Sequence, residues 1–99
     1  MTKQVSLLVN DEPIALDYFV EGFIDHTTGG MIAALEGTGG IKTLELTIDG
    51  EMVGIKLNGA DVSIKPFVST IIRSTVAGML SPLKGVSDTK RVKLNITRS

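Results

Sequence analysis

The sequence contains no cysteine and no tryptophan, and only three phenylalanines and one tyrosine. The lack of cysteine excludes a disulfide framework, a thiolate metal site and a cysteine nucleophile. The shortage of aromatic rings leaves little with which to stack the bases of a nucleic acid. No apolar run reaches the roughly 20 residues that a membrane span needs, and the first residues show no signal-peptide pattern. We therefore expect a soluble, cytoplasmic protein without a membrane partner.

The composition is that of a single globular domain. Hydrophobic residues make up 42% of the 99 residues and charged residues 21%, which is typical of a folded chain and not of a disordered one. The formal net charge is −1, so the chain as a whole does not favour a polyanionic partner. We predict one domain, residues 1–99.

An internal repeat with an offset of 48 residues dominates the sequence. Residues 19–37 read "FVEGFIDHTTGGMIAALEG" and residues 67–85 read "FVSTIIRSTVAGMLSPLKG". The same ungapped register holds for the rest of the chain and gives 13 identities in 46 aligned positions, whereas average composition gives about three by chance. We interpret the pattern as a duplication, with repeats at 1–48 and 49–99.

Each repeat predicts the element order ββαβ. The segments "VSLLV" and "VGIKL" alternate apolar residues with period two, which indicates strands. They are followed by Asn10-Asp11 and by Asn58-Gly59, and Asn-Gly between such runs is a strong hairpin signal. Short returning arms, a long helical segment and a third alternating strand ("KTLELTI" or "KRVKLNI") complete each unit.

The junction between the repeats predicts how their strands pair. Asp49-Gly50 lies between two alternating runs and indicates a hairpin, so the last strand of the first repeat should pair with the first strand of the second. By symmetry, "RVKLNIT" should pair with "VSLLV". We predict an α+β fold with pseudo-twofold symmetry, in which a six-stranded, mainly antiparallel sheet carries two helices on one face. A lone 48-residue unit buries too little surface, and two units bury each other's exposed face.

The two helical segments each show two neighbouring stripes at about 100° per residue. The first stripe, expected on the sheet, is Val20, Ile24, Thr27, Met31 and Leu35 with their counterparts 48 residues later. The second contains small residues and consists of Phe19, Phe23, His26, Gly30 and Ala34 with Phe67, Ile71, Ser74, Gly78 and Pro82. Because glycine inside a helix costs about 0.5–1 kcal/mol, we predict a close helix crossing at Gly30 and Gly78. A helix that breaks at Gly29-Gly30 is the alternative.

The outer edge of each predicted helix is apolar. The residues expected there are Thr28, Ile32, Val76 and Leu80, which we predict to be an interaction surface. The partner would be a second copy, giving a homodimer, or another protein. The charges differ between the repeats: the first has two basic and seven acidic residues, a net charge of −5, and the second has eight basic and four acidic, a net charge of +4. This asymmetry favours pairing of the two repeats over self-pairing; drift of solvated surface charges is the alternative.

The sequence contains no convincing catalytic, metal or cofactor site. His26 is the only histidine, its repeat counterpart is Ser74, and the adjacent Asp25 points in a different direction on a helix. The segment "GTGG" at 37–40 follows a helix, whereas phosphate loops precede one. Arg91 and Lys93 place positive charge on one face of the last strand, but without aromatic residues this does not favour nucleic acid over solvent. We predict no enzyme activity, no metal and no cofactor.

The pattern "VNG…I…FV…II…T..GM…LKG", which combines the two repeats, resembles small uncharacterised prokaryotic proteins, some of them near one repeat long. The resemblance implies no activity, and at most it is compatible with dimers of single-repeat relatives. From the residues we predict a non-enzymatic structural or protein-interaction module built as a fused pseudo-dimer. The alternative is a small-molecule binder with a cleft between the repeats. The sequence identifies neither a ligand nor a biological role.

Overall fold

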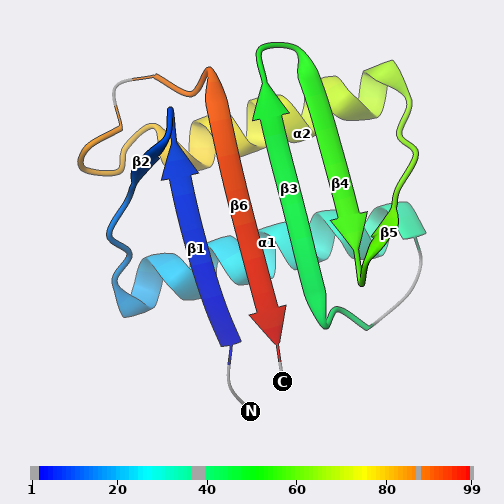
Figure 1. Ribbon diagram of the computed structural model, residues 1–99, viewed down its shortest axis with the longest axis horizontal. Helices are drawn as coiled ribbons and strands as arrows, with labels where there is room; N and C mark the ends of the chain where they lie inside the picture. The colour runs from blue at the N-terminus through cyan, green and yellow to red at the C-terminus, as the bar shows by residue number, and fades with distance from the viewer. Residues whose placement is uncertain (1–2, 37–39, 87, 99) are drawn as a thin grey trace.

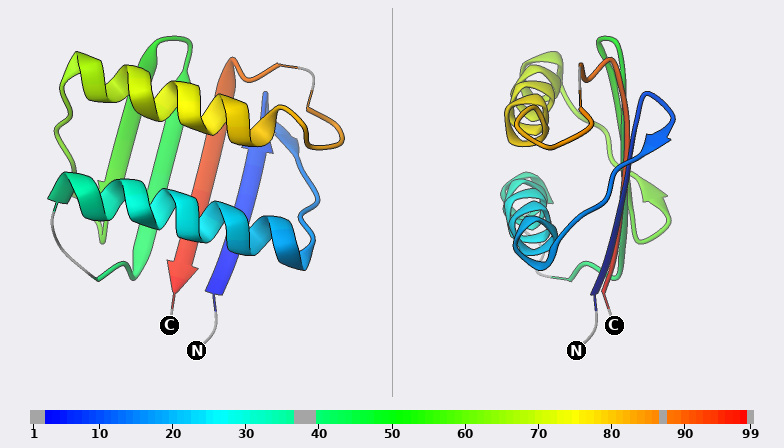
Figure 2. Two further views of the ribbon diagram at one scale, coloured as in Figure 1. Left: turned by 180° about the vertical axis from the view of Figure 1, so that it is seen from behind. Right: turned by 90° about the vertical axis from the view of Figure 1, so that its left-hand side faces the viewer.

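The computed structural model describes residues 3–36, 40–86 and 88–98. The chain has an α+β fold, in which two helices cover one face of an open six-stranded antiparallel sheet (Figures 1 and 2). The order strand, strand, helix, strand occurs twice along the chain. The elements are β1 (Lys3–Val9), β2 (Glu12–Pro13), α1 (Tyr18–Glu36), β3 (Thr43–Asp49), β4 (Met52–Leu57), β5 (Ala60–Asp61), α2 (Pro66–Leu80) and β6 (Arg91–Arg98).

The strands lie in the order β2-β1-β6-β3-β4-β5, so the third strand of each half occupies the centre of the sheet. Here the first half is residues 1–48 and the second half is residues 49–99. β3 pairs with β4, and β6 pairs with β1 on one side and with β3 on the other. The pairings of β3 with β4 and of β6 with β1 are those that the sequence predicts, whereas the sequence does not specify the central pairing of β3 with β6. The two strands at the edges are only two residues long.

Strict alternation along the central strands separates a buried face from an exposed one. In β3, Leu44, Leu46 and Ile48 are buried under the helices, and the residues between them are exposed. β6 repeats this pattern. The turns also agree with the sequence: Gly50 and Gly59 have φ of +61° and +85°, conformations that glycine adopts without steric cost.

Asn10 and Asn58 make matching hydrogen bonds to the two central strands. The backbone N–H of Asn10 donates to the Arg91 carbonyl over 2.7 Å, and its Oδ1 accepts from the Arg91 N–H over 2.9 Å. The N–H of Asn58 donates to the Thr43 carbonyl over 2.8 Å, and its Oδ1 accepts from the Thr43 N–H over 3.0 Å. Each asparagine therefore holds a strand that the other half supplies.

The helices are continuous and run antiparallel to each other across the sheet (Figure 2). α1 passes through Gly29-Gly30 without interruption, so the alternative of a break at that position is wrong. α2 begins with Pro66, whose missing N–H needs no partner in the first turn of a helix. It ends at Leu80, two residues before Pro82, which cannot continue a helix.

The helices are rotated about their axes relative to the sequence prediction. Thr28, Ile32, Val76 and Leu80 are at most 1% exposed and lie in the core. Their assignment to an exposed interaction surface was therefore wrong. Ile24 and Ile72 are buried beside them, so the buried stripe is centred about one position away from the predicted one. Two neighbouring apolar stripes made the direction ambiguous, because neither was marked by charge as the solvent side.

The predicted helix crossing at Gly30 and Gly78 is also wrong. Both glycines are exposed, and a Cβ added to either would meet no atom within 4 Å. The close contact is instead at Gly29, where an added Cβ would lie 2.6 Å from Nη2 of Arg98. Gly29 thus lets the end of β6 pack against α1, and the stripe with Gly30 and Gly78 faces away from the sheet.

Candidate functional site

The outer face of the helix layer carries no charged side chain in the part of the chain that the structure describes. Within residues 18–35 and 66–80, whose side-chain exposure the structure describes, none of the exposed residues is Asp, Glu, Lys or Arg. These exposed residues are Tyr18, Phe19, Phe23, His26, Gly30, Ala33 and Ala34 in α1, and Pro66, Phe67, Thr70, Ile71, Ser74 and Gly78 in α2. Solvent-facing helices normally mark their outer side with charge, so this face is unusual for a surface in water.

Four large apolar side chains stand on this face, and we call them the apolar patch: Phe19, Phe23, Phe67 and Ile71. Phe19 and Phe67 are 73% and 74% exposed, and Phe23 and Ile71 are 49% and 46% exposed. The two members of each pair are 48 residues apart, so equivalent positions in the two halves expose equivalent apolar area. The rings of Phe19 and Phe23 have centroids 6.0 Å apart, a distance at which aromatic rings attract each other.

The apolar patch leans toward the middle of the helix layer. On α1, Asp25 binds Arg98 at the carboxyl end of β6, and this end of the sheet lies beyond α1 on the side away from α2 (Figure 2). Phe23 is 200° away from Asp25 around the helix at 100° per residue, and it therefore lies on the flank facing α2. On α2, Arg73 lines a hollow with Glu51 beside the β3–β4 turn, so Ile71 leans toward α1 by the same reasoning.

Small residues surround the apolar patch. Beyond Phe23 the outer face of α1 continues with Gly30, Ala33 and Ala34, and beyond Ile71 the outer face of α2 continues with Ser74 and Gly78. Each helix therefore starts with bulky side chains and continues with small ones, so its outer surface is lower toward its end; we call these two regions the bulky and the low corner of the helix. A hollow of about 500 Å³ lies against Phe19, Phe23 and His26, at the bulky end of α1.

The opposite face of the molecule, the uncovered side of the sheet, has the usual composition of a solvated surface. The strand registers align one exposed row as Ser6, Asn95, Glu45 and Lys56 and another as Leu8, Lys93, Thr47 and Gly54. Glu45 pairs with Lys56 in the first row, and Lys93 is the charged residue of the second row. This mixture does not form the continuous positive surface that a nucleic acid needs.

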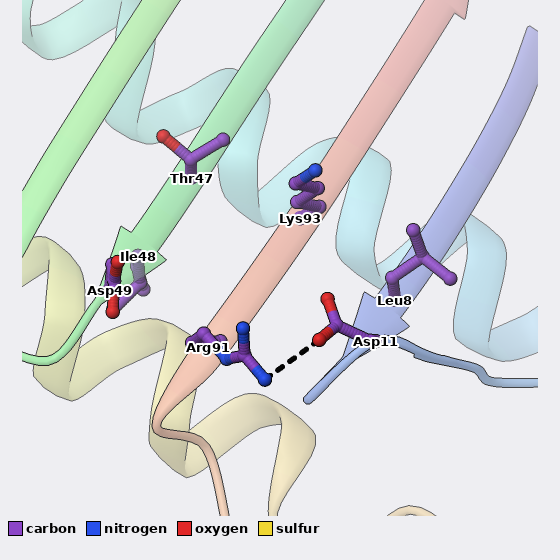
Figure 3. A pocket seen from close by; sticks show the side chains of 7 residues that line it. All are labelled: Leu8, Asp11, Thr47, Ile48, Asp49, Arg91 and Lys93. Atoms are coloured by element: carbon purple, nitrogen blue, oxygen red, sulfur yellow. Dashed lines mark ion pairs between the residues drawn. The ribbon is translucent and has the colours of Figure 1, made fainter.

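A pocket of about 300 Å³ lies on this open sheet face, where β1, β6 and β3 meet (Figure 3). Nη2 of Arg91 is 2.7 Å from Oδ2 of Asp11, and both side chains are more than half exposed. Lys93 and Thr47 lie beside this pair, so both halves of the chain contribute to the walls. The guanidinium already has a carboxylate partner, which leaves Lys93 as the basic group of the pocket without an ion-pair partner among the described residues.

Asp88 is the one described group with a resolved change in acidity. Nδ2 of Asn10 donates a hydrogen bond to Oδ1 of Asp88 over 2.6 Å, and this bond is the main reason that the pKa of Asp88 lies below its ordinary value of 3.8. The backbone N–H of Lys90 donates to the same oxygen over 3.3 Å and lowers the pKa further. The carboxyl is fully exposed, and the arrangement stabilises the loop before β6 and indicates no acid–base chemistry.

The predicted absence of chemistry at His26 stays a prediction. His26 is exposed on the outer face of α1, and the adjacent Asp25, about 100° away around the helix, pairs with Arg98. Among residues 3–36, 40–86 and 88–98, no three or more histidine or carboxylate side chains cluster as they would around a metal ion. In the same ranges, neither helix combines the length and the apolarity that crossing a membrane requires. The predicted loop at 37–40 falls largely outside the described residues.

Comparison of the chain with protein-family models, with curated proteins and with solved structures finds no match. The function must therefore be inferred from the surfaces themselves. Sequence reasoning had grouped Phe19, Phe23, Phe67 and Ile71 correctly into one stripe but had placed that stripe between the helices. The absence of charge from the stripe gave no signal that it faces away from the sheet, where the structure leaves these side chains exposed.

Proposed function

We propose that the protein is a non-enzymatic protein-interaction module, and that its outer helix face is the surface that binds a protein partner. The observation that carries this proposal is the lack of any charged residue among the exposed positions of residues 18–35 and 66–80 in the two helices. Exposed apolar area of this kind favours association, because burying it removes water from the rings of the apolar patch. The opposite face of the same molecule carries charges in the normal way, so the asymmetry is specific to one side.

We also propose that the module is a fused pseudo-dimer of two ββαβ halves related by a pseudo-twofold axis between β3 and β6. The order of strands, β2-β1-β6-β3-β4-β5, supports this. If each strand is replaced by its counterpart in the other half, the result is the same order read from the opposite edge of the sheet. Hydrogen bonds support it too. Gly50 N–H donates to the Lys90 carbonyl and Arg98 N–H to the Lys42 carbonyl, both over 2.9 Å, and each residue of one bond is 48 positions from its counterpart in the other.

Site-specific photo-crosslinking in the native cell tests the interaction surface. Benzoylphenylalanine placed at Phe67 should yield covalent adducts with a polypeptide, because this side chain is 74% exposed in the apolar patch. The control position is Asn95, which is exposed in the middle of the open sheet face. Absence of polypeptide adducts at Phe67, or equal adducts at both positions, would contradict the proposal.

The pocket at Arg91 and Lys93 supports a second candidate function, the binding of a small anionic molecule between the two halves. Its support is the contribution of both halves to one pocket of about 300 Å³ with a basic side chain free to pair, a volume at the low end of ligand sites. Titration with inorganic phosphate, followed by NMR, should shift the backbone amide signal of residue 93 saturably. In Lys93→Ala, the signal of the same residue should show no saturable shift. Lys56→Ala, on the same face outside this pocket, is the control. A linear, unsaturable response would exclude the site.

A further inference from the structure

We infer that the partner of the outer helix face is a second copy of this chain, docked helix layer against helix layer, with α1 of each copy lying over α2 of the other. The inference rests on the proposed interaction function and specifies its partner. Three properties of the face carry it: its profile of large and small residues, the distribution of charge around it, and its area.

The size profile of the helix face is complementary to itself. The bulky residues stand near the start of each helix, at Phe19 and Phe23 in α1 and at Phe67 and Ile71 in α2, and the small residues follow toward the end. The helices run antiparallel (Figure 2), so the bulky and the low corners of the layer alternate. A twofold axis that lies in the interface and parallel to the helices places each bulky corner over a low corner of the partner. Such an isologous contact closes after two copies.

The surrounding charges select one of two such arrangements. An axis across the helices would stack α1 on α1 of the partner, and an axis along them stacks α1 on α2. The first half, which contains α1, has a net charge of −5, and the second half, which contains α2, has +4. Apart from Asp25, which pairs with Arg98, α1 contains Glu21 and Glu36 and no Lys or Arg, while α2 contains Arg73 and no acidic residue. Like-charge stacking of the halves is unfavourable, so α1 lies over α2 of the partner.

The area of the face is sufficient for a stable dimer. The two larger extents of the molecule are 34 and 33 Å, and the helix layer spans most of both (Figure 2). Their product, about 1,100 Å², is the outline of the molecule and an upper limit for the helix face, and it exceeds the area of about 800 Å² per partner in an interface of standard size. Gly30 and Gly78 allow the two layers to approach closely, since no atom of the described residues lies within 4 Å of a Cβ added at either position.

Sedimentation velocity over the micromolar range tests the assembly. We expect a species of twice the chain mass of 10.5 kDa. Phe67→Ser should weaken dimerisation at least about tenfold, the size of effect that loss of one anchor of about 1.4 kcal/mol produces. Met52→Ser is the matched control, because Met52 and Phe67 are both 74% exposed but Met52 lies outside the apolar patch, and its dissociation constant should stay within about twofold. A dimer that Phe67→Ser does not weaken overturns the inference.

The lack of cysteine makes the orientation directly measurable. His26 and Ser74 are exposed near the middle of their helices, and they face each other across the proposed interface. A mixture of His26→Cys and Ser74→Cys chains, one of them tagged, should form the mixed disulfide under mild oxidation, and neither variant alone should form a disulfide. A disulfide in His26→Cys alone overturns the arrangement, because it requires α1 on α1.

The two proposals fail differently. A monomer throughout the micromolar range, together with photo-adducts from Phe67 to a different polypeptide, overturns the second copy as partner and leaves the interaction function standing. The absence of polypeptide adducts at Phe67 overturns the interaction function and, with it, the dimer. Adducts of twice the chain mass at Phe67 support both.

Discussion

Arg98 and Asp25 form a shielded ion pair that joins the carboxyl end of the central strand β6 to α1. Nε of Arg98 donates to Oδ1 of Asp25 over 2.8 Å, and Nη2 of Arg98 donates to the Asp25 backbone carbonyl over 3.2 Å. The Asp25 side chain is only 6% exposed and that of Arg98 is 25% exposed. A buried carboxylate keeps its desolvation cost when an ion-pair partner is removed, so loss of Arg98 should destabilise the protein more than loss of a partner from an exposed ion pair.

We predict that Arg98→Ala lowers the free energy of unfolding by about 2–3 kcal/mol, because two hydrogen bonds to a charged residue are lost and the carboxylate stays buried. Urea denaturation at one fixed protein concentration measures the change. Arg91→Ala is the matched control: its guanidinium also pairs with an aspartate at 2.7 Å, but the two side chains are 57% and 63% exposed. That variant should lose less than about 1 kcal/mol. Equal losses in the two variants would show that burial of Asp25 contributes nothing.

Gly29 and Gly30 should respond oppositely to alanine. Gly30→Ala should raise the free energy of unfolding by about 0.5–1 kcal/mol, since alanine is the better helix former and the added methyl meets nothing. Gly29→Ala should lower it by about 1 kcal/mol, because its methyl must displace the Arg98 guanidinium from Asp25. In an Arg98→Ala background the two substitutions should become equally stabilising. A difference that persists there would contradict the explanation.

Thr28 and Val76 are equivalent buried positions that differ only by a hydroxyl. Both are 0% exposed, and Oγ1 of Thr28 has no hydrogen-bond partner among the described residues. Thr28→Val should therefore stabilise the protein by about 1 kcal/mol, because an unsatisfied buried polar group is removed without change of shape. The reciprocal Val76→Thr should cost about 1–3 kcal/mol for the same reason. Thermal and urea unfolding of both variants measure the signs, and a destabilised Thr28→Val would mean that the hydroxyl is bonded in solution.

Acid titration should report the Asn10–Asp88 contact. The pKa of Asp88 lies below its ordinary value of 3.8, so the contact stabilises the folded state above the pKa of the unfolded chain. This stabilisation disappears as the pH falls through the lower, folded-state pKa. Asn10→Ala should move the Asp88 pKa back toward 3.8, as followed by carboxyl NMR. Asn58→Ala, the equivalent change in the other half, should leave Asp88 unaffected, and a similar shift in both variants would contradict a local cause.

The sheet could be predicted from the sequence because its signals are local and redundant. The turns at Asp49-Gly50 and Asn58-Gly59 and the period-two alternation fix strand pairing and the buried face, and the repeat supplies the remaining pairing of β1 with β6. The helix rotation could not be predicted in the same way. Sequence reasoning orients a helix by contrast between apolar and charged sides, and here the side facing solvent is apolar and small.

The contact of Asp25 with Arg98 was not predictable for a different reason. Its members are 73 residues apart, and the repeat gives no support, because the equivalent positions are Arg73 and Gly50. A contact that is present in only one half has no counterpart in the other half, so comparison of the repeats cannot reveal it. The same asymmetry applies to Thr28 and Val76, where one half has a hydroxyl and the other a methyl in the same place in the core.

The pairing of Lys3 with Arg98 places the amino end of β1 next to the carboxyl end of β6, as Figure 1 shows. β3 and β4 are neighbours in the same antiparallel sense, but a turn at Gly50 connects them. The backbone is therefore interrupted between β6 and β1 and continuous at the equivalent position between β3 and β4. Joining the two ends with a short linker and cutting at Gly50 would give a circular permutant with the same order of strands and helices. The architecture depends on which strands are neighbours and leaves the place of the break in the backbone free to move.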